Sequence, residues 1–391
     1  MKKRAITIVG AGIGGLTLAR FLAADGHRVT VVERASDFSA QGHSIGFRGV
    51  GFQVMELLGL RARVEQTGRH YRATRTYTMA GEPLRTVLSR DHAQAVGGIA
   101  VTQRGWLHAA LHEGLPPEIE VRLGVKPVGL QEEGEAVVVQ LSDGTSLRSD
   151  LLVGADGANS AIRRLAMPDI ESIDCGGVYV GMTIKTDHGL TVQEVAAYFG
   201  VARIVSFLPI DRQSVSVVIY QDDSYEAVPV ENSPEVWAPY LKRAFADAAE
   251  PVRRILPSLQ LGDDIYHDRI RQVPPKQVVS GRIALVGDAG YCPTFFSGNG
   301  SALAAVGAYC FAKSLRMSED DRAVLETYQN RILPFAAGYQ TNATRLRNTL
   351  FTHSGWKIAL RHLALRYTPE FIYSRGTRRH YRGEVRLSEV M

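Results

Sequence analysis

The chain opens on two short apolar runs with a cluster of glycines between them. Residues 5–9 and 28–32 are rich in valine and other β-branched residues, and both predict strands. The first has the continuous apolar character of a strand buried on both faces, as parallel strands are. Residues 16–24 are rich in alanine and leucine and predict a helix between the strands. This order of elements predicts a βαβ unit at the start of an α/β fold.

The pattern of apolar strand, polar turn and helix occurs twice more. Residues 151–166 (LLVGADGANSAIRRLA) place Asp156 in a turn after an apolar strand. Residues 281–315 place Asp288 after another, and an alanine-rich helix begins at about residue 301. Each stretch alone is also typical of an ordinary structural turn. Together, in this order, they predict three turns that meet at one site.

The pattern changes between these stretches and again after them. Residues 175–275 hold alternating or β-branched runs separated by turn residues, which predict an antiparallel sheet joined by a shorter contribution from residues 71–100. Residues 318–391 are predominantly helical and basic in pattern. Within them, residues 355–371 carry apolar side chains at helical spacing with Lys and Arg on the other side. We expect this helix to pack its apolar face across both domains; a membrane-surface helix and a dimer contact are the alternatives.

The glycines of the first turn have a recognisable spacing. Gly10, Gly12 and Gly15 form G-x-G-x-x-G, with Ile13 and Gly14 inside it. The first glycine permits the tight turn, the second lets a pyrophosphate approach the backbone, and the third lets the helix lie close to the strand. Free N–H groups and the dipole at the helix N-terminus would then face the phosphates. The turn predicts a dinucleotide site.

The acid that ends the second strand narrows the choice of dinucleotide. Glu33 follows Gly12 by twenty-one positions, where a carboxylate accepts hydrogen bonds from a ribose 2'-hydroxyl. A 2'-phosphate would be repelled there, so the site favours FAD or NAD and disfavours NADP.

The second acidic turn favours FAD over NAD. An aspartate just past a strand end, Asp288, can bind a hydroxyl of a ribityl chain, which NAD lacks. The following loop runs from Pro293 to Gly300, and Gly298 and Gly300 leave room for it to approach a flavin ring. Backbone N–H groups there are suited to stabilise negative charge.

With these motifs in this order, the sequence resembles the single-component flavin-dependent aromatic hydroxylases, the class of para-hydroxybenzoate hydroxylase. The resemblance rests on the glycine turn at 10–15, the DG motif at 156–157 and the GD motif at 287–288, and it covers nearly the whole chain. The stretch SIGFRGVGFQVMELLGL at 44–60 is similar to the branch of the tetracycline-inactivating monooxygenases. Asn299 departs from the family pattern, which has Gln between the two glycines.

The resemblance implies an α/β fold with interleaved domains: a Rossmann-like FAD-binding domain of the GR2 type, an antiparallel-sheet substrate domain and a C-terminal helical segment. The expected ranges are 1–70, 101–174 and 276–340 for the FAD-binding domain, 71–100 and 175–275 for the substrate domain, and 341–391 for the helical segment.

The resemblance also implies further cofactor residues. Arg104 matches an arginine that begins a helix and reaches the FAD phosphates or ribityl chain, and Arg48 matches one beside the flavin. Arg34 is expected along the adenosine or in water. Asp156 is similar to a residue that contacts FAD and transiently NAD(P)H.

In this family the flavin carries out the chemistry. The protein orients the reactants, excludes water from the site and supplies the local electrostatic environment. NADPH or NADH reduces FAD, O2 adds to form the flavin C4a-hydroperoxide, and one oxygen atom passes to an aromatic or polycyclic molecule, such as a natural product or antibiotic. Another flavin reaction (oxidase, reductase or halogenase-like) and a non-catalytic flavin-binding module are the alternatives. No catalytic base is assigned.

Side chains on one face of the predicted sheet would line the substrate pocket. The candidates are Tyr179, Arg203, Phe207 and Tyr220, although for each of them a core or surface position is the stronger interpretation.

The composition excludes some classes of partner and of site. There are 45 Lys and Arg residues and 40 Asp and Glu residues. This positive excess is small and scattered along the chain, so it does not indicate nucleic acid as a partner. The 3 cysteines have neither metal-ligand nor disulfide spacing, so we expect reduced thiols and no metal. No apolar stretch reaches the roughly 18 residues that a bilayer requires. We therefore expect a cytoplasmic protein without a membrane partner, as a monomer or weak homodimer.

Overall fold

The computed structural model describes residues 2–38, 44–89, 99–231, 233–261, 263, 265–350, 354–380 and 387. The first half of the fold is built on a six-stranded sheet in the order β17-β18-β11-β1-β2-β7. In that order, the strands are Val279–Ser280, Ile283–Leu285, Leu151–Gly154, Ala5–Val9, Arg28–Val32 and Glu120–Arg122. The central pairs are parallel, with Val9 opposite both Gly154 and Val32. The turns after β1 and β11 therefore lie side by side.

A seven-stranded sheet forms the second half, in the order β16-β12-β15-β14-β13-β4-β5. In that order, the strands are Ile265–Gln272, Ile173–Lys185, Ser214–Gln221, Arg203–Pro209, Glu194–Phe199, Ala73–Thr78 and Pro83–Leu88. We expected an antiparallel sheet, and the pairs are antiparallel except β13 with β4, which is parallel. The parallel pair arises because β4 comes from a separate part of the chain and is joined to β13 by a long crossover.

Two smaller sheets complete the strands. One, in the order β10-β9-β8, consists of Ser146–Ser149, Ala136–Leu141 and Pro127–Glu133; the other pairs β3 with β6 (Ser44–Arg48 and Ile99–Gln103). The helices of the first half are α1 Ile13–Ala24, α2 Val50–Leu57, α3 Arg61–Thr67, α5 Arg104–His112, α6 Ala161–Ala166, α9 Asp288–Tyr291 and α10 Gly300–Met317, with the 3-10 turn η2 Phe295–Ser297. The remaining helices are α7 Pro234–Ala244, α8 Glu250–Ile255 with the 3-10 turn η1 Leu256–Ser258, α11 Asp321–Leu350, α12 Gly355–Tyr367 and α13 Glu370–His380.

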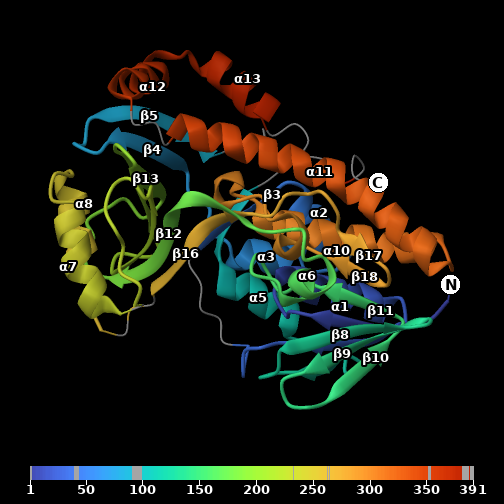
Figure 1. The fold of residues 1–391 in the computed structure, drawn as a ribbon. Helices are drawn as coiled ribbons and strands as arrows, with labels where there is room; N and C mark the ends of the chain where they lie inside the picture. The colour runs from blue at the N-terminus through green and yellow to red at the C-terminus, as the bar shows by residue number, and fades with distance from the viewer. Residues whose placement is uncertain are drawn as a thin grey trace.

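Each large sheet has its own core. The six-stranded sheet packs against α1 and α10, and these elements form the largest cluster of buried apolar side chains. The seven-stranded sheet buries one face under α7 and α8, with Trp237 fully buried. The long helix α11 runs past both halves (Figure 1), since Tyr328 belongs to the first cluster while Ala343 and Leu350 join a third cluster against the second sheet.

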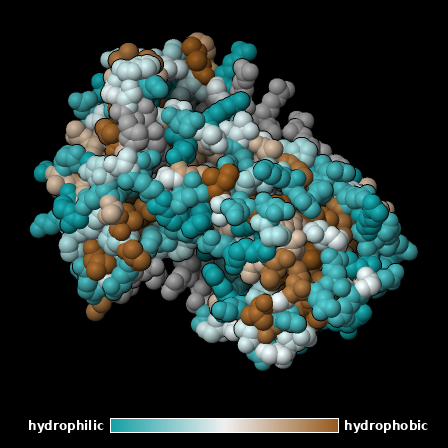
Figure 2. Space-filling view, viewed as in Figure 1, coloured by the Kyte–Doolittle hydropathy of each residue, from teal (hydrophilic) through white to brown (hydrophobic). Residues whose placement is uncertain are grey.

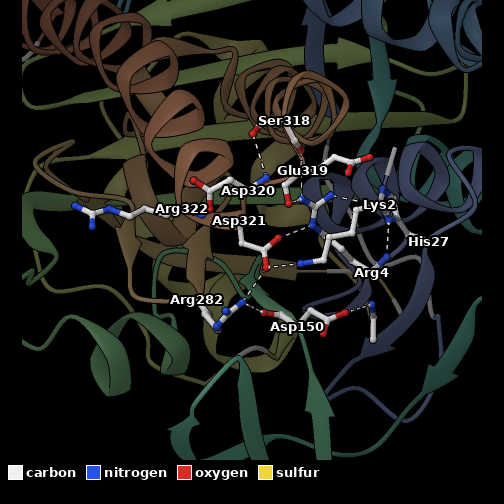
Figure 3. A network of polar contacts seen from close by, with 11 residues as sticks. Lys2, Arg4, His27, Asp150, Arg282, Ser318, Glu319, Asp320, Asp321 and Arg322 are labelled. Atoms are coloured by element: carbon white, nitrogen blue, oxygen red, sulfur yellow. Dashed lines mark hydrogen bonds and ion pairs between the residues drawn. The ribbon is translucent and has the colours of Figure 1, made fainter.

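A polar network fixes the start of the chain to the start of α11 (Figure 3). The Asp321 carboxylate accepts hydrogen bonds from Arg4 Nε at 2.6 Å, Arg282 Nη1 at 2.9 Å and Lys2 Nζ at 3.1 Å. The Arg4 side chain is 0% exposed, and its guanidinium also donates to the backbone oxygens of Ser318 and Glu319. A buried charge needs such partners, so the network ties β1 to the helix that runs past both halves.

Candidate functional site

The glycine turn after β1 is open where an anion would bind. Gly10 has φ 108°, and a Cβ there would overlap the backbone of Ala155 in the neighbouring turn. Gly12 is the N-cap of α1; a Cβ there would meet nothing within 4 Å, and no side chain caps the helix. The first N–H groups of α1 therefore face free space, as a pyrophosphate site requires.

Glu33 is held at the edge of this turn. One carboxylate oxygen accepts a hydrogen bond from Ala11 N at 2.8 Å, and the other accepts one from Ala35 N at 2.9 Å. These two hydrogen bonds hold the Glu33 carboxylate beside the glycine turn. The ribose of a bound dinucleotide would lie there if its pyrophosphate binds at the N-terminus of α1. Arg34, the next residue, is exposed.

A histidine not singled out from the sequence supports the same turn. His108 Nε2 forms a hydrogen bond with the Ala11 carbonyl oxygen at 2.7 Å, and burial lowers the pKa of the ring, which favours its neutral form. His108 lies four residues after Arg104 on α5, so both project from one face of the helix. That spacing was the available signal. Nearby, Phe38 and His112 stack with ring centroids 4.6 Å apart.

A cavity of about 250 Å³ lies where the remaining motifs meet the second sheet. The sequence-predicted residues Arg104, Asp288, Pro293, Gly298, Asn299 and Gly300 all line it. Other parts of its wall come from Gly46 on β3 and Ala158 in the DG turn. The structure therefore brings together residues that are up to about two hundred and fifty positions apart.

Asp288, in the GD turn, and Asp268, on β16, are the acidic residues that line this cavity; Asp288 is the one predicted from the sequence. It is the first residue of α9, directly after Gly287, whose φ is 68°. Burial raises the pKa of its carboxyl, and the positive charge of Arg104 opposes that shift. A carboxyl in this setting is suited to hydrogen-bond a neutral hydroxyl, the group that a ribityl chain offers.

The loop before α10 turns backbone groups toward the cavity. Thr294 has φ 72°, a strained value for a β-branched residue, and Gly298 adopts the left-handed conformation at φ 60°. Asn299 is the N-cap of α10 and makes no side-chain cap. The N-terminus of α10 therefore presents its N–H groups and its positive dipole end beside the cavity.

The DG turn is joined to the GD turn by an arginine. The Arg163 guanidinium donates to the carbonyl oxygens of Ala158 and Ala289, both at 2.7 Å. Asp156 itself accepts hydrogen bonds from Ser160 Oγ at 2.5 Å and from Ala161 N at 2.6 Å. Its carboxylate thus caps α6 and shapes the turn.

Arg48 ends β3, whose residue Gly46 borders the cavity; the Arg48 side chain lies outside the described part of the structure.

Aromatic side chains form the opposite wall. Tyr179 on β12 lines the cavity and stacks on Phe295 with ring centroids 4.0 Å apart. Tyr220 on β15 is not among the lining residues but packs against this wall, with its ring centroid 4.3 Å from that of Phe295. Tyr266 on β16 also lines the cavity, and burial raises its pKa to about 12. Tyr266 and Phe295 were not predicted from the sequence. The available signal for Tyr266 was its spacing of two residues from Asp268, which puts both on one face of β16.

Arg203 and Phe207, two of the candidates for the substrate pocket, do not face the cavity and take the core positions favoured for them. Phe207 is fully buried in the core under α7 and α8. Arg203 donates to the Ala244 carbonyl oxygen at the end of α7 and pairs with Asp247. Residues 203, 205 and 207 share one face of β14, because side chains alternate along a strand, and that face is turned away from the cavity.

Comparison with known proteins decides the family. The sequence matches the profile of the FAD binding domain family over residues 3–343. The chain belongs to this family. It is 29% identical over 381 residues to 3-amino-4-hydroxybenzoate 2-monooxygenase of Streptomyces cremeus, covering 93% of this chain and 92% of that protein.

Two solved structures share the fold of this FAD binding domain protein. HpxO of Klebsiella pneumoniae, complexed with FAD and uric acid, has a TM-score of 0.86 at 22% identity, covering 97% of each chain. The tetracycline destructase Tet(51) has a TM-score of 0.76 at 22% identity, covering 95% of this chain and 98% of that one. The predicted family and the α/β fold with a Rossmann-like FAD-binding part and a helical C-terminal segment are confirmed.

FAD is the cofactor, and the described residues fit it. The space at Gly12, the uncapped N-termini of α1 and α10 and the buried Asp288 carboxyl correspond to a diphosphate, a ring and a polyol.

Proposed function

We propose that this FAD-dependent enzyme inserts one oxygen atom from O2 into a planar aromatic or polycyclic molecule, with NAD(P)H as the reductant. The observation that carries the proposal is the meeting of the GD turn and the α10 N-terminus with an aromatic wall around one cavity. Flat rings suit flat substrates, because stacked aromatic groups bury apolar area and restrict orientation.

In this proposal each part of the site has a separate task. Bound FAD supplies the electron transfer and the activation of O2. Gly10, Gly12, Ile13, Gly14 and Gly15 hold its pyrophosphate on α1, and Glu33 holds the ribose. Arg104 and Asp288 position the middle of the cofactor by charge and hydrogen bonding. The N–H groups of residues 298–300 stabilise negative charge beside the ring.

The protein's second task is to exclude water. Tyr179, Tyr266 and Phe295 close one side of the cavity with apolar ring surface. A dry wall holds the substrate against the cofactor and limits the loss of activated oxygen as hydrogen peroxide.

The relatives support the substrate class. One is named for an aminohydroxybenzoate, one structure contains uric acid and another is named for tetracycline. All three are ring compounds with electron-donating groups. We extend this class to natural-product and antibiotic-like polycycles, and we place the protein in the cytoplasm, as a monomer or weak homodimer, with NADPH or NADH as co-substrate.

Substrate-stimulated oxidation of NAD(P)H tests the proposal. A panel of phenols, purines and polycycles is added to the FAD-loaded protein, and products one oxygen atom heavier are sought by mass spectrometry. A compound that accelerates NAD(P)H oxidation and gains an oxygen atom supports the proposal. Peroxide release without a product across the panel would instead indicate an oxidase or a flavin-binding module.

Replacing Tyr179 by alanine is expected to weaken turnover and coupling. The stacked pair with Phe295 is lost and water enters the cavity, so kcat/KM for the substrate should fall about tenfold and peroxide release should rise. Tyr367→Ala is the matched control, because Tyr367 is 68% exposed on α12. Unchanged coupling in Tyr179→Ala would remove this residue from the substrate wall.

A further inference from the structure

One face of the C-terminal helices is exposed and apolar. In α12, Trp356, Leu360, Leu363 and Tyr367 are between 58% and 68% exposed. Their spacing of four, three and four residues puts them on one face of the helix. Phe371 and Ile372 at the start of α13 are 72% and 49% exposed and extend this face, which we call the outer stripe.

The opposite face of α12 is fixed to the protein by polar contacts. Arg361 is 7% exposed and donates to the Leu350 carbonyl oxygen at 2.6 Å. From β5, Arg85 donates to the carbonyl oxygens of Leu365 and Thr368 at 3.1 and 2.8 Å. These contacts set the rotation of the helix, so the outer stripe points away from the sheet.

This arrangement reverses what the sequence led us to expect. The apolar face was predicted to pack across both domains with the basic side chains outside. Instead the buried Arg361 meets the end of α11, carbonyl oxygens of the helix meet Arg85 on β5, and the large apolar side chains are outside. The helix α11 is the element that runs past both halves (Figure 1).

The outer stripe lies at the periphery of the molecule. In Figure 1, α12 and α13 form the upper edge beside β4 and β5, and Figure 2 shows brown side chains at this edge. Among the described residues, the stripe therefore lies at an edge that a flat surface can reach. Contiguous apolar side chains of this kind mark an interaction site in a water-exposed protein.

The charge around the stripe indicates which surface it fits. Residues 355–380 contain six arginine and lysine residues and one acid, Glu370. That acid is already paired with Arg85 at 2.6 Å. Lys357 lies over the Trp356 ring at 5.6 Å, and Arg375 is exposed on α13. Two of the six do not belong to the border of the stripe, because Arg361 is buried on the opposite face and Arg366 pairs with Glu82. The four others still exceed the single, already paired acid.

Aromatic and leucine side chains with a basic border are the composition of helices that lie in the interface of an anionic bilayer. A second copy of the chain would bring the same positive charges together, which opposes self-association. None of the helices in the described ranges is long and apolar enough to cross a bilayer, so contact with lipid would be at its surface.

We propose that the outer stripe docks the protein on an anionic lipid bilayer, with Trp356, Leu360, Leu363, Tyr367 and Phe371 among the upper acyl chains and the basic side chains at the headgroup phosphates. The proposal departs from the expectation that no membrane takes part, and it does not depend on the reaction catalysed.

Co-sedimentation of the FAD-loaded protein with vesicles tests the proposal. The protein should pellet with vesicles of phosphatidylcholine mixed with phosphatidylglycerol, and much less with phosphatidylcholine alone. Added salt should weaken the binding, because it screens the basic border. The double variant Leu360→Glu, Leu363→Glu should lower the partition coefficient at least about tenfold, since it removes apolar contact and adds negative charge.

The matched control is Leu261→Glu, because Leu261 is 84% exposed elsewhere on the molecule. This variant should bind vesicles as the unaltered protein does. FAD absorbance and circular dichroism establish that both proteins are folded, and Arg375→Glu, which leaves the apolar stripe intact, tests the charge separately.

Three results would overturn the proposal. The unaltered protein could fail to bind anionic vesicles, or the double variant could bind them as well as the unaltered protein does. The third is a stable dimer in solution that the double variant converts to monomers, because the stripe would then be covered by a second copy.

Discussion

Replacing Gly12 by aspartate is expected to leave the protein folded and to abolish practical FAD binding. A Cβ at Gly12 would meet no atom within 4 Å, and φ is −74°, so the backbone there accepts a side chain without strain. Aspartate is also a good N-cap, and it would occupy the N–H groups of α1 that the pyrophosphate needs. Like charges then face each other, and FAD affinity should fall at least about 100-fold, or about 3 kcal/mol.

Titration with FAD, followed by flavin fluorescence, measures this effect, and thermal unfolding of the apoprotein shows that the fold persists. Gly338→Asp is the control, since Gly338 lies within α11 and a Cβ there would also meet nothing within 4 Å. Normal FAD affinity in the Gly12 variant would place the pyrophosphate elsewhere.

Replacing Asp321 by asparagine is expected to destabilise the whole chain. The variant leaves the guanidinium of Arg4, whose side chain is 0% exposed, without its carboxylate partner. Removing one member of a buried ion pair costs about 3 kcal/mol or more. Urea unfolding measures the loss. Glu326→Gln, which breaks an exposed pair with Arg322 on the same helix, should cost less than about 1 kcal/mol.

The same carboxylate predicts a pH dependence. Burial raises the pKa of Asp321, but hydrogen bonds from Arg4, Arg282 and Lys2 outweigh it, and the pKa lies below its ordinary value. The carboxylate therefore contributes stability above the pKa of the unfolded chain, about 4, and that contribution is lost as the pH falls through the lower pKa of the folded state. This acid-side loss should be smaller in Asp321→Asn. Equal acid sensitivity in both proteins would assign the effect to other carboxyls.

The parts of the fold that were predictable from sequence depend on local pattern. The strands Ala5–Val9 and Arg28–Val32 have the predicted bounds, because β-branched apolar runs and a glycine turn define them within the chain. That Asp288 would lie at the same site as the other turns could be predicted from its position after an apolar strand, since the ends of parallel strands meet at one edge of a sheet, and it does line the cavity.

The unpredicted parts depend on which side of an element faces which neighbour. Tyr179 lines the cavity and Phe207 does not, although both lie in apolar strands, because the register of the sheet decides the face. The helix α12 has apolar residues on both sides, including Ile358 on one and Leu363 on the other. Its orientation is set by contacts with Arg85 on β5, about 280 positions away in the sequence.

The hydrogen bonds from Arg163 to the carbonyl oxygens of Ala158 and Ala289 hold two turns of the site together. They connect the turns after β11 and β18 through one guanidinium. The spacing between Ala158 and Asp288, which both line the cavity, therefore depends on a buried side chain that is not itself part of the lining.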